Sequence, residues 1–202
     1  MKIIYGRAGT GKSEYIFDDI KKNEAQKIYI ITPEQFSFSA EKRLLDTLDN
    51  DATTKVEVLS FERMAYNVMK EMCPMDKPKI EKSGKSMLIY EAIIKNQKQL
   101  NFLGKSLENV DMILTQITEF KKHNISVEAL RKQIEMTDDK YLKMKLNDMC
   151  IIYSELESNI ADFQDENDVL TVLAENIEAS HLFDNAVFYI DEFAGFTKQE
   201  YS

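Results

Sequence analysis

A glycine-rich segment near the start of the chain restricts the fold more than any other feature. Residues 6–13 read Gly6-Arg7-Ala8-Gly9-Thr10-Gly11-Lys12-Ser13, which fits the pattern G-x-x-x-x-G-K-[ST] at every required position. Such a loop follows an apolar strand and opens a helix, because its backbone N–H groups and the positive end of the helix dipole converge on a phosphate. The pattern therefore predicts a strand over residues 2–5, a helix over residues 12–22 and a phosphate-binding loop between them.

The loop also predicts its own ligands. The ammonium group of Lys12 is expected to reach the β- and γ-phosphates of a nucleotide, and the hydroxyl of Ser13 to bind Mg²⁺. The backbone of Gly6, Arg7, Ala8, Gly9, Thr10 and Gly11 would form the rest of the cradle. The other interpretation is a glycine-rich turn without a ligand.

An apolar run that ends in two acids suggests the second half of a nucleotide site. It reads Val187-Phe188-Tyr189-Ile190-Asp191-Glu192. Asp191, at the carboxyl end of this strand, is expected to hold the water shell of Mg²⁺, and Glu192 to polarise an attacking water. Lys12, Asp191 and Glu192 are thus the candidate catalytic residues. The alternative is the solvated end of an ordinary buried strand.

The order of predicted elements divides the chain into three zones. In residues 1–79, strands at 2–5, 27–32 and 56–59 alternate with helices at 12–22, 39–48 and 61–72, which indicates parallel βαβ units. Residues 80–182 show no convincing strand. Residues 183–202 contain one strand, 186–190, which predicts that the helical zone is inserted into a single α/β sheet.

The helical zone carries apolar stripes at spacings of three and four residues. Such stripes predict the core of a helical bundle, although an exposed partner-binding groove would have the same pattern. The first stripe consists of Leu107, Val110, Leu114 and Ile117, and the second of Leu142, Leu146, Met149, Tyr153, Leu156 and Ile160.

Charge limits where nucleic acid could bind. The net charge is −9, and no Lys or Arg occurs between Leu146 and Thr197, so this stretch cannot neutralise phosphates. Contacts with a single strand are instead predicted just past the second and third strands of the first zone. The candidates are Gln35, Phe36, Ser60, Phe61 and Arg63, and the alternative is that the two phenylalanines are core residues.

Other features predict no chemistry. Ser83-Gly84-Lys85-Ser86 repeats part of the phosphate pattern but lacks its first glycine, so a helix start with a serine cap is expected. His123 and His181 are isolated, and surface or capping positions are expected for both. With two cysteines, Cys73 and Cys150, and no apolar run of membrane-spanning length, we expect a cytoplasmic protein without disulfides and without a membrane partner.

Several segments together resemble the amino-terminal part of the AddB subunit family of bacterial AddAB-type helicase–nucleases, including its RexB-like relatives. The most distinctive are Pro33-Glu34-Gln35 and Gly195-Phe196-Thr197-Lys198-Gln199-Glu200. The loop at 6–13 and the segments 29–36, 58–65 and 189–200 contribute to the resemblance. Asp162-Phe163-Gln164-Asp165 also resembles the stretch that precedes motif II in superfamily 1 helicases.

The resemblance implies a RecA-like P-loop NTPase sheet, similar to domain 1A of superfamily 1 helicases, with an inserted helical subdomain similar to domain 1B. It implies ATP and Mg²⁺ as ligands, an AddA-type partner subunit, and a complex that processes double-strand DNA ends for recombinational repair. The family's nuclease domain and iron–sulfur cysteines are expected outside these residues, so Cys73 and Cys150 are not cluster ligands.

Two points leave the activity open. No glutamine precedes the loop to read adenine, and the second RecA-like domain, which would supply an arginine finger, is not expected here. The segment should therefore bind nucleotide but turn it over poorly. A nucleotide-binding structural or DNA-recognition module without motor activity, and a P-loop kinase of small molecules, are the alternatives.

Overall fold

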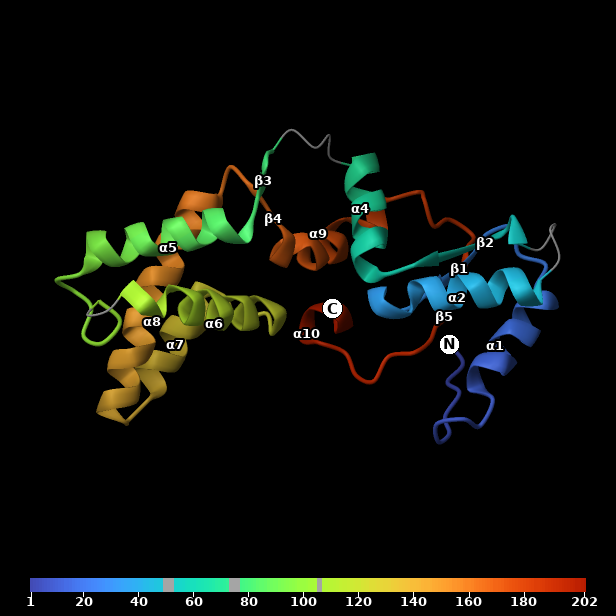
Figure 1. Cartoon of the computed structure of the whole chain (residues 1–202), viewed down its shortest axis with the longest axis horizontal. Coiled ribbons are helices and arrows are strands. Elements are labelled where there is room, and N and C mark those ends of the chain that lie inside the picture. Colours follow the sequence, from blue (N-terminus) through green and yellow to red (C-terminus); the bar gives the residue numbers. More distant parts are fainter. Residues whose placement is uncertain (49–52, 73–76, 105–106) are drawn as a thin grey trace. The chain divides into compact units, whose positions relative to one another are not determined.

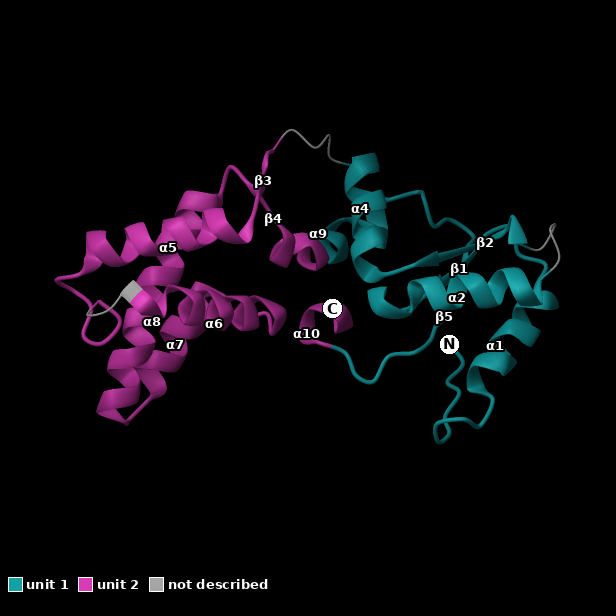
Figure 2. Ribbon diagram, in the orientation of Figure 1, with its two compact units in different colours: residues 1–74, 172–196 teal, residues 75–171, 197–202 magenta. Residues whose placement is uncertain are grey.

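The chain is an α/β protein with two compact units (Figures 1 and 2). The computed structural model describes residues 1–48, 53–72, 77–104 and 107–202. Unit 1 comprises residues 1–74 and 172–196, and unit 2 comprises residues 75–171 and 197–202. The changeovers differ from the zone boundaries at 79 and 182, because helix α9 (Val169–Asn176) straddles one of them and the final turn packs within unit 2.

Unit 1 is built on a parallel sheet of three strands. The strands are β1 (Ile28–Ile31), β2 (Val56–Leu59) and β5 (Val187–Ile190), in the order β2-β1-β5. Ile28 is in register with Val56 on one side and with Val187 on the other. The strands predicted near 27–32, 56–59 and 186–190 are confirmed, and so is their parallel direction.

The predicted strand at residues 2–5 is wrong. Residues 1–7 have no strand pairing, and the side chains of Met1, Ile3 and Tyr5 are exposed. This segment buries too little apolar surface to offset the loss of chain entropy that an ordered strand requires. The glycine-rich loop therefore follows an extended segment rather than a strand.

Helices cover the two faces of the sheet. Helices α1 (Lys12–Lys21) and α2 (Glu34–Thr47) pack on the face that contains Ile28 and Ile30. Helix α4 (Phe61–Met72) contacts β2 and buries its own apolar stripe. Helix α2 begins at Glu34, five residues before the predicted start at Ser39. The residue before this helix is Pro33, with φ −56° and ψ 144°, and proline is favoured at the start of a helix.

Unit 2 is mainly helical. Its long helices are α5 (Lys82–Asn96), α6 (Val110–Lys122), α7 (Val127–Met136) and α8 (Lys140–Ile160), and α8 packs against α5 and α7. The short elements of the chain from residue 77 on are β3 (Lys79–Ile80), η1 (Leu107–Asn109), β4 (Gln164–Asp165), η2 (Glu166–Asp168), η3 (Ile177–Ala179) and α10 (Lys198–Tyr201). Of these, η3 lies in unit 1.

The parallel pair β3–β4 was not predicted, because two residues are too few to show a period.

The predicted apolar stripes form the core of unit 2. The members that are buried are Leu114, Ile117, Met149, Tyr153, Leu156 and Ile160. Val110 and Leu146 pack against them while partly exposed. Leu142 is 47% exposed and lies in the first turn of α8, so its inclusion in the core was wrong. The side chain of Leu107 lies outside the described residues.

The remaining predictions away from the sheet have clear outcomes. His123 is the C-cap of α6, and His181 is an exposed residue that contacts Asp184. Cys150 is buried and free, whereas Cys73 lies outside the described residues. None of the helices in the described part of the chain is long and apolar enough to cross a membrane.

A buried ion cluster, formed by Lys85, Lys121 and Asp165, ties the helices of unit 2 together. The two lysines are 3% exposed and the aspartate 2% at their side chains. The Asp165 oxygens accept from Lys85 Nζ at 3.0 Å and from Lys121 Nζ at 2.9 Å. Lys121 also contacts Asp168 at 2.9 Å. Three helical segments and β4 are thus joined around one carboxylate.

The charges of this cluster are held by their mutual contacts. Burial raises the pKa of Asp165, but the Asn167 amide and the ammonium groups of Lys121 and Lys85 lower it more, so this pKa lies below its usual range. Burial lowers the pKa of Lys121, and its carboxylate neighbours raise it by more. Both groups are therefore charged at neutral pH.

Removing the charge of Asp165 should destabilise the protein strongly. We expect Asp165→Asn to lower the free energy of unfolding by about 3–5 kcal/mol, because two buried ammonium groups lose their shared partner. Asp168→Asn is the matched control, and a smaller loss is expected since its carboxylate is 43% exposed. Urea unfolding at pH 7 measures both.

The same comparison has a pH dependence. Because the folded pKa of Asp165 is depressed, its contribution is present above the unfolded pKa of about 3.9 and is lost as the pH falls through the folded value. Asp165→Asn should lack this part of the acid sensitivity. Equal unfolding midpoints for the two variants would contradict the role of the cluster.

Candidate functional site

The glycine-rich loop adopts a conformation that its glycines make possible. Gly9 has φ +76° and Gly11 has φ +83°, both in the left-handed region where a Cβ is unfavourable. Gly11 is the residue that precedes α1, and Tyr15 N donates to its carbonyl at 2.9 Å. The helix thus begins directly at Lys12, with its unpaired N–H groups at the loop.

Lys12 lies against the inside of this loop. Its Nζ donates to the carbonyl of Gly6 at 3.0 Å and to that of Arg7 at 2.9 Å. The hydroxyl of Thr10 also donates to the Arg7 carbonyl, at 2.8 Å. The loop therefore wraps around one ammonium group that stands at the start of a helix.

The end of β5 lies next to the start of α1, which packs on the same sheet. Asp191 N donates to the Ile31 carbonyl at 3.0 Å, which holds the chain at the edge of the sheet. The Ser13 hydroxyl donates to Glu192 Oε1 at 3.4 Å. Glu192 has φ +66°, a left-handed conformation that is uncommon for residues other than glycine.

The structure thus brings together the two segments that the sequence analysis paired. The side-chain contact that joins them runs from Ser13 to Glu192. That Ser13 and Asp191 both serve a Mg²⁺ ion stays a prediction. Within the described residues, no three His, Cys, Asp or Glu side chains are grouped closely enough to hold a metal ion by themselves. Oxygen donors at this site come from one hydroxyl and the two adjacent acids.

The five predicted nucleic-acid residues lie past β1 and β2, and they differ in solvent exposure and in their contacts within the protein. Gln35 and Phe36 are exposed in the first turn of α2. Ser60 is buried, and its Oγ accepts from Arg63 N at 3.2 Å. The Phe61 ring lies 5.4 Å from that of Phe193. That these residues contact nucleic acid stays a prediction.

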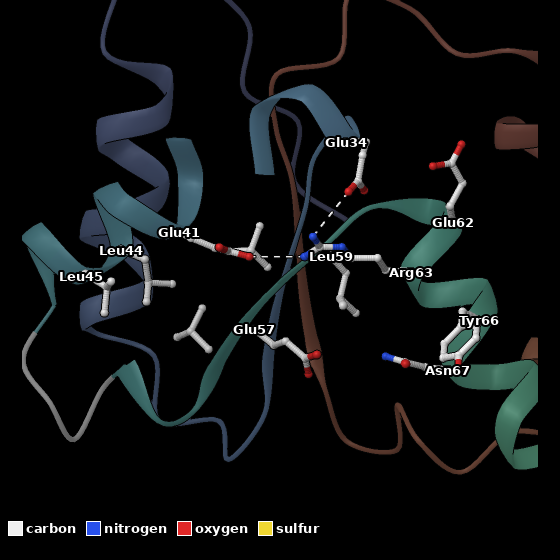
Figure 3. A pocket seen from close by; sticks show the side chains of 12 residues that line it. Glu34, Glu41, Leu44, Leu45, Glu57, Leu59, Glu62, Arg63, Tyr66 and Asn67 are labelled. Atoms are coloured by element: carbon white, nitrogen blue, oxygen red, sulfur yellow. Dashed lines mark hydrogen bonds and ion pairs between the residues drawn. The ribbon is translucent and has the colours of Figure 1, made fainter. Parts of the chain in front are cut away.

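Arg63 is already paired within the protein. Its guanidinium lies 3.4 Å from Glu34 and 3.3 Å from Glu41, both on α2 (Figure 3). These pairs are about half exposed, so each adds little to stability. They do reduce the charge that Arg63 offers to an outside phosphate.

The sequence analysis missed the aromatic partners of Phe61 and a counter-ion of Arg63. Phe193 and Phe196 stack on each other at 4.8 Å, and both face Phe61. Glu34 is a counter-ion of Arg63. Phe61 follows β2 and the other two rings follow β5, on the two sides of β1, whereas Glu34 follows β1 itself. Knowledge of the strand order was the signal needed to find them.

The second Gly-Lys-Ser segment is not a phosphate loop. Residues 83–86 lie within helix α5, and Lys85 is buried against Asp165. The residue that precedes this helix is Glu81, so the expectation that a serine caps it was wrong.

Fold and site together define the class of this protein: an α/β protein whose glycine-rich loop opens a helix beside a strand that ends in two acids. Comparison of sequences defines it further. The family model described as "ADDB, N-terminal" matches residues 3–202. The chain belongs to this family.

Curated relatives match the whole chain. One from Clostridium botulinum (strain Loch Maree / Type A3) is 41% identical over 210 residues and 100% of this chain. Relatives from Clostridium tetani and Ruminiclostridium cellulolyticum are 39% and 38% identical, over 100% and 99% of the chain. Each is named as a subunit of an ATP-dependent helicase/deoxyribonuclease, and the chain spans 18% of the length of each.

The left-handed glycine before α1 yields a stability test. We expect Gly11→Ala to cost about 1–2 kcal/mol of unfolding free energy, because an L-residue is strained at φ +83°. Gly195→Ala is the control, since a Cβ there meets no atom within 4 Å, and a change within about 0.5 kcal/mol is expected. Thermal unfolding measures both, and equal losses would argue against the observed loop conformation.

Proposed function

We propose that unit 1 binds ATP with Mg²⁺ through the Gly6–Ser13 loop. The observation that carries this proposal is the loop that wraps around the Lys12 ammonium group at the start of α1, with Ser13 directly beside Glu192. Parallel strands with helices on both faces support a RecA-like arrangement. The unpaired residues 2–5 depart from it.

The chemistry of the donors fits the proposed ligand. Backbone N–H groups of the loop and the Lys12 ammonium would hold the phosphates. The oxygens of Ser13 and Asp191 would hold Mg²⁺, which prefers hard oxygen ligands and retains several waters. Bound Mg²⁺ would neutralise charge on the phosphates. Glu192 would orient a water, which requires that its carboxylate release the Ser13 hydroxyl.

For the whole protein we propose one subunit of a helicase–nuclease that processes double-strand DNA ends with an AddA-type partner subunit. The name that the relatives share and the family match across residues 3–202 support this assignment. Hydrolysis needs charge stabilisation from a second domain in such motors. This segment alone is therefore expected to bind nucleotide with little turnover, and the iron–sulfur cluster of the family is expected outside it.

The second candidate is a nucleotide-binding module that recognises DNA without motor activity. The contact between Ser13 and Glu192 favours it, because this contact occupies the hydroxyl that would bind Mg²⁺. A small-molecule kinase is less well supported, since unit 2 is large, helical and held by its own buried ion cluster. Steady-state ATP hydrolysis by the full-length protein, with and without DNA ends, separates these functions.

Lys12→Ala tests the nucleotide site. We expect the affinity for ATP·Mg²⁺ to fall at least about tenfold, roughly 1.4 kcal/mol, because the charge opposite the phosphates is lost. Lys22→Ala removes an exposed lysine at the other end of α1 and should leave binding unchanged. Calorimetric titration measures both, and the same affinity in both variants would refute the assignment.

The charge of the chain predicts weak binding of nucleic acid by this segment alone. With a net charge of −9, we expect binding of fluorescein-labelled oligothymidylate to be weaker than micromolar at physiological salt and steeply salt-dependent. In the full-length protein, Phe36→Ala combined with Arg63→Ala should weaken oligothymidylate binding relative to the unmodified protein. Phe38→Ala, on the same helix as Phe36, should leave it unchanged.

Fluorescence anisotropy measures this binding. Micromolar or tighter affinity of the segment would contradict the first expectation. Wild-type affinity of the double variant in the full-length protein would remove Phe36 and Arg63 from the DNA path.

A further inference from the structure

A groove runs along strand β2 in unit 1, between helices α2 and α4 (Figure 3). Its volume is about 740 Å³, within the range of ligand sites. One wall comes from α2 and the other from α4. None of its lining residues belongs to the Gly6–Ser13 loop or to the end of β5, so this β2 groove is distinct from the nucleotide site proposed above.

The base of the β2 groove is an open sheet edge. Among the described residues, β2 pairs only with β1. Ile28 N donates to the Lys55 carbonyl and Thr32 N to the Leu59 carbonyl. Alternate residues of a strand bond to the same neighbour, so the backbone N–H and C=O groups of Val56 and Val58 point toward the groove. An extended chain could pair with them.

The two walls of the β2 groove differ in character. Successive residues of a strand face opposite sides of the sheet. On the α2 side the lining combines the apolar Leu44, Leu45, Val56 and Val58 with Glu34 and Glu41, the two glutamates that pair with Arg63. On the α4 side, Glu57 and Glu62 are exposed. A strand added to this edge would therefore meet apolar side chains on one face and carboxylates on the other.

The acidic side chains that line the β2 groove determine which kind of ligand it favours. Four glutamates and one arginine line the groove, and that arginine, Arg63, is engaged by Glu34 and Glu41. The remaining carboxylates, Glu57 and Glu62, repel phosphates and attract cations. A nucleic-acid strand is thus disfavoured here, and a segment with lysine or arginine is favoured.

We propose that the β2 groove binds an extended basic segment of a partner polypeptide, which adds to the sheet as a strand beside β2. Main-chain hydrogen bonds to Val56 and Val58 supply part of the affinity, as in other cases of strand addition. Specificity comes from side-chain alternation: apolar residues of the segment face Leu44 and Leu45, and basic residues face Glu57 and Glu62.

A synthetic peptide tests the proposal directly. The probe is a fluorescein-labelled eight-residue peptide that alternates lysine and valine, titrated with the protein and followed by anisotropy. We expect saturable binding, at least tenfold weaker binding of a peptide that alternates glutamate and valine, and loss of binding when alternate amides of the first peptide are methylated. Equal binding of all three peptides would overturn the proposal.

Charge reversal locates the site. Glu57→Lys combined with Glu62→Lys should weaken binding of the lysine–valine peptide at least tenfold. Glu24→Lys changes an exposed glutamate of the same unit that does not line the groove, and it should weaken binding less than twofold. If the double reversal fails to fold, Glu57→Gln with Glu62→Gln replaces it, and a loss of at least threefold is expected. Equal losses in the groove variants and in Glu24→Lys would overturn the site.

Hydrogen exchange identifies the strand pairing. Bound peptide should slow exchange of the Val56 and Val58 amides, with no comparable change at α1. Protection confined to other segments would overturn the proposal. Protection of the Val56 and Val58 amides in the absence of peptide, if it increases with protein concentration, would also overturn the proposal. A second copy of the chain would then occupy the edge of the sheet at β2.

Discussion

The parallel pairing of β1 with β2 on one side and β5 on the other is the constraint on which unit 1 depends. Because all three strands run in one direction, their carboxyl ends lie along one edge of the sheet. That edge collects the start of α2, the start of α4 and the two acids after β5. The Asp191 N–H bond to the Ile31 carbonyl extends the pairing one residue past the strand. Helix α1 packs on this sheet, and its Ser13 contacts Glu192, 179 residues away, past the end of β5.

The two units use charge in different ways. In unit 1 the ion pairs of Arg63 are half exposed and link two helices past the strand ends, where water screens them. In unit 2 Lys85, Lys121 and Asp165 are almost fully buried. Glu166 also contacts Lys85, and Glu157 and Asp168 also contact Lys121, but Asp165 is the buried carboxylate that both lysines share, so its loss is costly. The Asp-Phe-x-Asp segment, which resembles the stretch that precedes motif II in superfamily 1 helicases, therefore has a structural role in this chain: its second aspartate, Asp165, contacts both buried lysines of unit 2.

The ion pairs of Arg63 also affect where nucleic acid could bind to this chain. An arginine that already contacts two glutamates offers little net charge to a phosphate, and the carboxylates around it make this side of the sheet acidic. The aromatic group of Phe61, Phe193 and Phe196 lies nearby along the same strand ends, with Phe196 46% exposed. These rings are better suited to stack on a base than Arg63 is to pair with a phosphate.

Local patterns in the sequence predicted several main elements of the fold. The glycine spacing of residues 6–13 predicted the loop and the start of α1, because only glycine adopts φ near +80° without strain. Apolar runs predicted β1, β2 and β5, and the period of 3.6 predicted the core of unit 2. These features depend on residues that are neighbours along the chain, so the sequence by itself determined them.

Tertiary structure decided which of these elements meet. It left residues 2–5 unpaired, joined Ser13 to Glu192, gave Arg63 two glutamate partners and buried Lys85 beside Asp165. Each outcome depends on the order of strands in the sheet or on the packing of helices far apart in the chain. A pattern along the sequence does not specify this order. The interaction energy of two side chains depends on their distance, their burial and their neighbours, and only the folded chain supplies these.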